Sequence, residues 1–150
     1  MRNLMIQRTI AAPRSAVWAV LADYPNIADW NEGVQRSVAL GDAVEGLGAQ
    51  RHCELTPSGA MRETVTEWEP EEKMAVAIDK IEKMPVAEAT MTFTLADSGT
   101  TTSITMSYDF APKGGPFAFL IAAMLNRPMT KGFNGFIDNL ESAAQARAAG

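Results

Sequence analysis

Residues 88–110 read EATMTFTLADSGTTTSITMSYDF, which is two runs of alternating polar and apolar residues on either side of Asp97-Ser98-Gly99. Such alternation is typical of strands with one buried face, and the short turn between them favours an antiparallel hairpin. Four earlier segments alternate in the same way and are separated by turns rich in Gly, Pro, Asp and Ser: 33–40, 47–55, 60–69 and 73–81. Six successive short strands predict an antiparallel meander.

Segments with helical spacing of their apolar residues lie before and after these strands in the sequence. We expect a first strand over residues 4–10 and then two short helices, over 13–23 and 26–30. After residue 116 one apolar stripe follows helical spacing through Met129, Phe133, Phe136, Ile137 and Leu140. Pro128 is expected to kink or break this long helix, and the Ala-rich end over 143–150 is expected to fray. The sequence therefore predicts an α+β fold, in which a curved seven-stranded antiparallel sheet wraps around a long C-terminal helix.

Composition and charge exclude several classes of function. The chain has 150 residues, which predicts a single domain over 1–150, and a net charge of −5, which argues against nucleic-acid binding. It has only one histidine and one cysteine, His52 and Cys53, so we expect no metal site and no cofactor. The two side chains point to opposite faces of a strand, so we expect no Cys–His pair. The longest uncharged apolar stretch, 114–126, is shorter than the ~20 residues of a membrane span. With no visible signal peptide, the protein is expected to be cytoplasmic.

Four segments together carry a family resemblance: Ile6-x-x-x-Ile10-Ala11-Ala12-Pro13 with Val17-Trp18, Asp23-Tyr24-Pro25 to Trp30, Glu63-x-Val65-x-Glu67 before Glu69-Pro70, and the helix after Gly114-Gly115. Over about residues 3–142 the chain resembles the START-like (SRPBCC) superfamily. That superfamily includes the birch-pollen allergen fold, plant abscisic-acid receptors, and the bacterial polyketide cyclase/dehydrase and lipid-transport-like proteins. The resemblance implies a helix-grip fold with an internal pocket for an apolar ligand, and it leaves carriers, receptors and enzymes open.

Alternation predicts which side chains face this pocket. The apolar ones are Val65, Val76, Ile78, Met91, Phe93, Met106 and Tyr108 from the strands, and Met124, Met129 and Phe133 from the helix. Arg51, Glu63 and Glu67 share the inner face, where a charge must be paired, hydrated or in contact with a ligand. A three-residue loop within Thr56–Gly59 would place Arg51 opposite Glu63, whereas a two-residue loop would not.

Three functions fit these residues. The leading hypothesis is a non-enzymatic protein that binds or transports a small hydrophobic or amphipathic molecule, lipid- or polyketide-like, whose polar end is oriented by Arg51, Glu63 and Tyr108. The first alternative is a polyketide cyclase or aromatase that uses Glu63, Glu67 or Tyr108 as acid–base groups. The second is a ligand-free protein-interaction module. A structural ion pair of Arg51 with Glu63, beside a solvated Glu67, would also satisfy the charges.

The segment Phe117–Leu125 is apolar on more than one face. It could be plain core, a lid over the pocket, a membrane-surface contact or a homodimer surface. Because the net charge is negative, an anionic membrane is disfavoured, and a lid or a homodimer is the favoured interpretation.

Overall fold

The computed structural model describes residues 1–150 and has the predicted order of elements. The strands are β1 (Arg2–Ile10), β2 (Val34–Leu40), β3 (Gln50–Leu55), β4 (Ala60–Glu69), β5 (Lys73–Glu82), β6 (Val86–Ser98) and β7 (Thr101–Pro112). The helices are α1 (Arg14–Ala22), α2 (Ala118–Ala149) and the short 3₁₀ helices η1 (Tyr24–Asp29) and η2 (Gly115–Phe117). No helix combines the length and the apolar character that crossing a bilayer requires.

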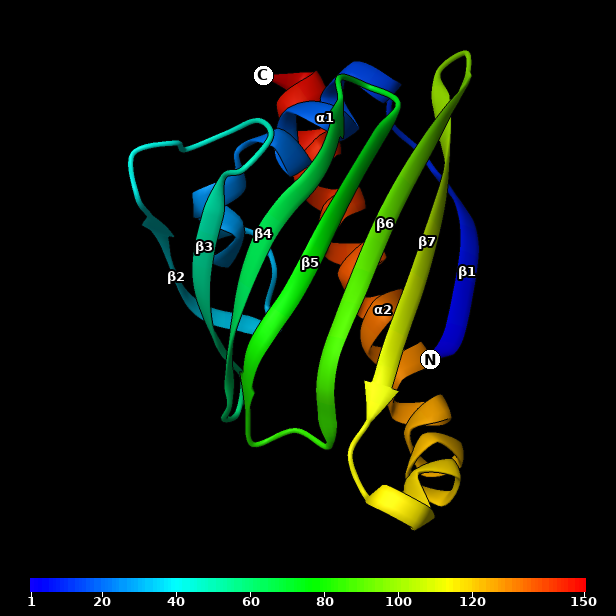
Figure 1. Ribbon diagram of the computed structural model, residues 1–150. Coiled ribbons are helices and arrows are strands. Elements are labelled where there is room, and N and C mark those ends of the chain that lie inside the picture. The colour runs from blue at the N-terminus through cyan, green and yellow to red at the C-terminus, as the bar shows by residue number, and fades with distance from the viewer.

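The seven strands form one antiparallel sheet in the order β1-β7-β6-β5-β4-β3-β2. Figure 1 shows the sheet curving around α2, with α1 and the C-terminal end of α2 together at the upper end. Because side chains alternate along each strand, one face of every strand points toward the helix. This is the helix-grip fold that the sequence predicts.

The core lies between the concave face of the sheet and the two α-helices. Ile137 and Leu140 of α2 and Val17 of α1 are completely buried against strand residues such as Ile104 and Met106. Burying a side chain of this size contributes about 1.5–3 kcal/mol. All three fully buried residues of α2 belong to its second half, so that half anchors the helix on the sheet.

Residues 143–149, which the sequence predicts to fray, continue α2 as a helix. The helix continues to Ala149, and Ala144 is completely buried. Gln145 Nε2 donates to the carbonyl of Ala11 over 3.2 Å, and Arg147 forms an ion pair with Asp23 at 3.5 Å. The alanines are small enough to let this end of α2 pack against α1, and that packing outweighs their weak amphipathic pattern.

α2 continues through Pro128, so the break that was one of the two expectations for this proline does not occur. A proline removes one backbone hydrogen bond, while the turns on either side keep theirs. Two residues later the Thr130 hydroxyl donates to the Asn126 carbonyl over 2.7 Å.

A β-bulge at Thr66 reverses the alternation of side chains along β4. Val65 lies opposite Val76, but Glu67 lies opposite Ala75, so Thr66 is the extra residue. Glu67 is therefore exposed, where it accepts a hydrogen bond from Lys73 Nζ at 3.2 Å, and the prediction that it faces the pocket was wrong. Trp68 turns inward instead and packs edge-on against Trp18 at 5.1 Å.

Candidate functional site

A cavity of about 470 Å³ lies between the sheet and the middle of α2. This volume is within the roughly 300–1,000 Å³ that is usual for ligand pockets. Nine residues predicted to face the pocket line it: Arg51, Glu63, Ile78, Met91, Phe93, Met106, Tyr108, Met129 and Phe133. Most of the lining is apolar, and five methionines, including Met61 and Met84, give it flexible, polarizable walls.

Four other predicted residues lie elsewhere. Val65 and Val76 face the same side of the sheet but are buried in the core, toward the end that Trp68 and α1 close off. Glu67 is turned to solvent by the bulge. Met124 is 74% exposed on the outer face of α2, so its assignment to the pocket was wrong. Its segment is apolar on several faces, and helical spacing alone did not distinguish the inner face from the outer.

Arg51 and Glu63 form an ion pair that is almost completely buried at the cavity wall. The three-residue loop is present, since Leu55 pairs with Gly59 across it, and it sets the two residues directly opposite on β3 and β4. Arg51 Nε donates to Glu63 Oε1 over 2.7 Å, and Nη1 donates to the carbonyl of Tyr24 over 2.7 Å. The guanidinium also lies 3.9 Å above the centre of the Tyr24 ring, a cation–π contact.

The charge of this pair is stabilised by its surroundings. Burial lowers the pKa of Arg51, but Glu63 and Tyr24 more than offset that effect, so the pKa is raised and the guanidinium stays charged. Burial raises the pKa of the Tyr24 hydroxyl and of the Cys53 thiol, and both remain neutral. The Cys53 thiol donates to Glu63 Oε1 over 3.4 Å. Both hydrogen bonds to Glu63 end on Oε1, so Oε2 is left without a protein partner.

Tyr108 on β7 supplies a second polar group to the cavity. Burial, and to a smaller degree the charge of Glu63, raises the pKa of Tyr108 to about 12. At neutral pH its hydroxyl is therefore a proton donor, and it makes no hydrogen bond within the protein. Its ring lies edge-on to the ring of Phe133, with the ring centres 4.9 Å apart, and is stacked on the ring of Phe110, with the centres 5.4 Å apart.

Thirteen of the 22 lining residues were missing from the predicted site, among them Asn31 and Phe136. Asn31 lies in the segment after η1, where there is no periodicity to predict its orientation, and its Oδ1 accepts hydrogen bonds from the Gly33 amide and the Asn139 amide group. Phe136 stacks on Phe93 at 5.4 Å and lies edge-on to Trp30 at 5.2 Å. Phe136 belongs to the apolar stripe of α2, so its helical spacing with Phe133 was the signal for it.

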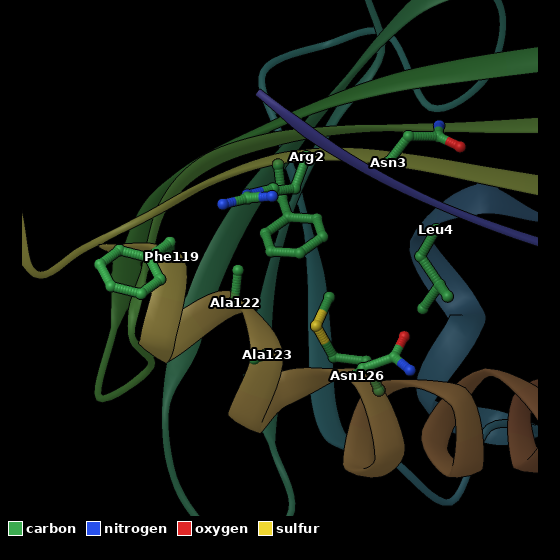
Figure 2. A pocket seen from close by; sticks show the side chains of 9 residues that line it. Arg2, Asn3, Leu4, Phe119, Ala122, Ala123 and Asn126 are labelled. Atoms are coloured by element: carbon green, nitrogen blue, oxygen red, sulfur yellow. The ribbon is translucent and has the colours of Figure 1, made fainter. Parts of the chain in front are cut away.

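A second, smaller hollow of about 360 Å³ lies between the beginning of β1 and the first turns of α2. Figure 2 shows Arg2 and Leu4 of β1 on one side and Ala122, Ala123 and Asn126 of α2 on the other, with Phe119 at the edge. Met129 borders both this hollow and the main cavity. The first half of α2 is therefore a wall between two spaces.

Comparisons with known proteins agree with this architecture. Residues 1–145 match the family described as polyketide cyclase / dehydrase and lipid transport. No curated protein matches the sequence.

Solved structures of several different proteins share the fold. The aromatase/cyclase ZhuI from Streptomyces sp. R1128 superposes with a TM-score of 0.81 at 19% identity, covering 99% of this chain and 98% of that one. Norcoclaurine synthase from Thalictrum flavum, in complex with dopamine and hydroxybenzaldehyde, superposes with a TM-score of 0.72 at 14% identity, covering 97% of this chain and 87% of that one. Ara h 8.0201 superposes with a TM-score of 0.75 at 10% identity, covering 97% of this chain and 98% of that one. At these identities the likeness shows the fold alone.

Proposed function

The chain belongs to the polyketide cyclase/dehydrase and lipid-transport family, and on that premise we propose that its internal cavity binds a small hydrophobic or amphipathic molecule. The observation that carries the proposal is an apolar cavity whose wall includes polar atoms without protein partners, Glu63 Oε2 and the Tyr108 hydroxyl. Pockets of this kind use apolar walls for affinity and a few fixed polar groups for orientation.

The two polar groups favour a particular kind of ligand. Tyr108 donates a hydrogen bond at neutral pH, which suits a carbonyl oxygen, and the Glu63 carboxylate accepts one, which suits a hydroxyl or an enol. Arg51 keeps Glu63 in place without using Oε2. A lipid- or polyketide-like molecule that carries both a carbonyl and a hydroxyl group satisfies both positions, and its remaining carbon atoms contact Met91, Phe93 and Met106.

The test uses anilinonaphthalene sulfonate, whose fluorescence rises on entering an apolar site, as a probe. Gly132 lines the cavity, and a Cβ built there meets nothing within 4 Å, so Gly132→Phe places a ring at the cavity. Gly135 accepts a Cβ equally well but does not line the cavity, so Gly135→Phe is the matched control. We expect saturable binding by the parent and by Gly135→Phe and weak binding by Gly132→Phe. Equal binding by all three would exclude the cavity as the site.

A cyclase-type activity is the second candidate, and the same two polar groups favour it. In such a reaction Glu63 would take a proton from the carbon beside a ketone, and Tyr108 would donate a hydrogen bond to the enolate oxygen that forms. The enolate carbon would then bond to a second carbonyl carbon of the substrate and close a ring, and the alkoxide left at that carbonyl would take the proton back from Glu63. The fold of an aromatase/cyclase is the same as the fold of this chain.

Proton transfer can be tested without the natural substrate. Deuterium exchange at the carbon beside the carbonyl of a long-chain methyl ketone is compared for the parent and Glu63→Gln. A general base at Glu63 predicts that exchange falls by about 10²–10⁴-fold while binding of the ketone is largely kept. Equal exchange rates in the two proteins would remove the cyclase candidate and leave the binding proposal intact.

A further inference from the structure

The lysines and arginines fall into two groups, those that form an ion pair and those that form none. Of the thirteen lysines and arginines, seven form ion pairs. The six that form none are Arg2, Lys80, Lys83, Lys113, Arg127 and Lys131. They lie at the start of β1, around the β5–β6 turn, after β7 and on the first half of α2, which together make up the lower part of the molecule in Figure 1.

Acidic residues are fewer at this end. Glu82, Glu88 and Asp109 are the unpaired ones on the same strand ends, and between Asp109 and Asp138 the chain contains no acidic residue at all. The turns at the opposite end carry most of the remaining negative charge, through Asp42 and Glu45, the Glu69–Glu72 turn and Asp97. The net charge of −5 is therefore the sum over two ends of opposite character.

The same basic end exposes large apolar side chains. Phe117 is 63% exposed, and Phe119, Leu120 and Met124 are also exposed. Figure 2 shows Phe119 projecting from the first turn of α2, on the side where Arg2 reaches over from β1. Exposed apolar residues that cluster in this way mark interaction sites.

Helical geometry joins the apolar and basic groups into one surface. Leu120, Met124, Arg127 and Lys131 are spaced i, i+4, i+7 and i+11, so they follow one another along one face of α2. The inner face of the same segment, with Leu125, Pro128 and Met129, lines the cavity. The exposed surface is thus on the outside of the helix that walls the ligand site.

We propose that this end of the molecule, from Lys113 to Lys131 with Arg2 and Lys83, docks on the surface of an anionic lipid bilayer. Phe117, Phe119, Leu120 and Met124 enter the boundary between head groups and acyl chains, and the surrounding cations contact lipid phosphates and carboxylates. The objection from net charge does not apply, because charges are screened within about 8 Å at physiological salt. A 32-residue helix is roughly 48 Å long, so the acidic turns at the far end of the molecule are several screening lengths away.

Charge also argues against a second copy of the chain as the occupant. A two-fold symmetric dimer through Phe117–Leu125 would bring the same surface of both copies together. Arg127 and Lys131 of each copy would then face a segment of the other copy that contains no acidic residue to pair with them. The homodimer considered from the sequence is therefore the less favourable use of this surface.

The test is sedimentation with vesicles of phosphatidylcholine alone and of phosphatidylcholine mixed with phosphatidylserine. We expect binding to the mixed vesicles only, and weaker binding at high salt. The Arg127→Gln/Lys131→Gln variant is expected to lose about 25-fold in partitioning, about fivefold for each cation. The control, Lys73→Gln/Arg147→Gln, has the same net charge but changes cations that lie in ion pairs away from this surface, and it should bind like the parent.

The apolar half of the surface has its own variant, Phe119→Ser/Met124→Ser, which should bind the mixed vesicles more weakly than the parent while melting at a similar temperature. The proposal would be overturned if the parent failed to bind the mixed vesicles or bound both compositions equally. It would also be overturned if the control variant lost as much binding as Arg127→Gln/Lys131→Gln. If vesicles do not bind and sedimentation equilibrium shows a dimer that Phe119→Ser/Met124→Ser dissociates, the surface belongs to a second copy. Probe binding in the cavity is measured for each variant, so a failure of docking is distinguishable from a failure of ligand binding.

Discussion

The Arg51 guanidinium lies between the Glu63 carboxylate, which it contacts at 2.7 Å, and the ring of Tyr24, whose centre is 3.9 Å away. The side chains of Arg51 and Glu63 are 6% and 8% exposed, and both also line the cavity. The pair is thus a structural link between β3, β4 and η1 and, at the same time, part of the proposed ligand site. The first prediction separates these two roles.

Glu63→Gln should lower the free energy of unfolding by about 3–5 kcal/mol, since it leaves the Arg51 charge buried without its partner. The loss will be smaller to the extent that water enters the cavity. Ligand binding should also weaken, by roughly 1–3 kcal/mol, because a charged hydrogen-bond acceptor is lost. Urea unfolding and probe titration of Glu63→Gln, Arg51→Met and the double variant measure both effects. A Glu63→Gln protein that unfolds and binds like the parent would contradict both roles.

Glu67→Gln is the matched comparison, because the bulge at Thr66 places this carboxylate in solvent beside Lys73. An exposed pair of this kind contributes about 0–1 kcal/mol, so the free energy of unfolding should change little. Binding of the probe should be unchanged, since Glu67 does not line the cavity. A marked loss of affinity in Glu67→Gln would show that β4 keeps its strict alternation in solution.

The two tyrosines, Tyr24 and Tyr108, should resist ionisation in the folded protein. Burial raises the pKa of Tyr24, and burial together with the charge of Glu63 raises the pKa of Tyr108 to about 12. The phenols hold their protons more tightly when folded than when unfolded, where the pKa is near 10.0. Their contribution to stability is therefore complete below pH 10 and declines as the pH rises from there toward about 12.

Phenolate absorbance checks this prediction directly. The native protein should show no tyrosine ionising near pH 10, whereas the protein unfolded in urea should show both. Tyr108→Phe should reduce the alkaline loss of stability without abolishing it, because Tyr24 remains. A tyrosine that titrates at its ordinary pKa in the native protein would place one of these rings in solvent.

Trp18→Ala should cost about 3–5 kcal/mol of stability, as is usual when a large aromatic side chain is removed from a core. Trp18 is buried on α1 and packs edge-on against Trp68. Thermal melting measures the loss, and Trp30→Phe is a useful comparison, since the buried indole N–H of Trp30 has no hydrogen-bond partner to lose. A melting temperature unchanged by Trp18→Ala would show that α1 does not close this end of the sheet.

Alternation was enough to predict the sheet because one face of each strand is buried and the other is not. In β6 and β7, Met91, Phe93, Met106 and Tyr108 all face inward as their spacing indicates. The facing of these side chains depends on local sequence, which is why it could be predicted. The register between Arg51 and Glu63 depends on the length of one loop, which the sequence left open between two and three residues.

The errors have a common physical cause, which is that the deciding contact comes from a distant part of the chain. Trp68 is drawn inward by Trp18 of α1, and the strand accommodates it with a bulge that places Glu67 outside. Met124 lies on a segment whose inner face is determined by where the second half of α2 anchors on the sheet. Asn31 lies in a segment without periodicity, where its distant contact is the Asn139 amide group of α2, which donates to its Oδ1.

The anchoring of α2 by its second half has a consequence for how this protein can diversify. The residues that wall the cavity from α2, such as Leu125, Met129 and Phe133, are outside the fully buried set, which begins at Ile137. Substitutions among them change the shape of the site at a smaller cost in stability than substitutions among the strand residues opposite, such as Met106 or Phe93. For the proposed binding function, new ligand preferences can therefore be selected, in evolution or in the laboratory, by varying the helical wall while the sheet is left as it is.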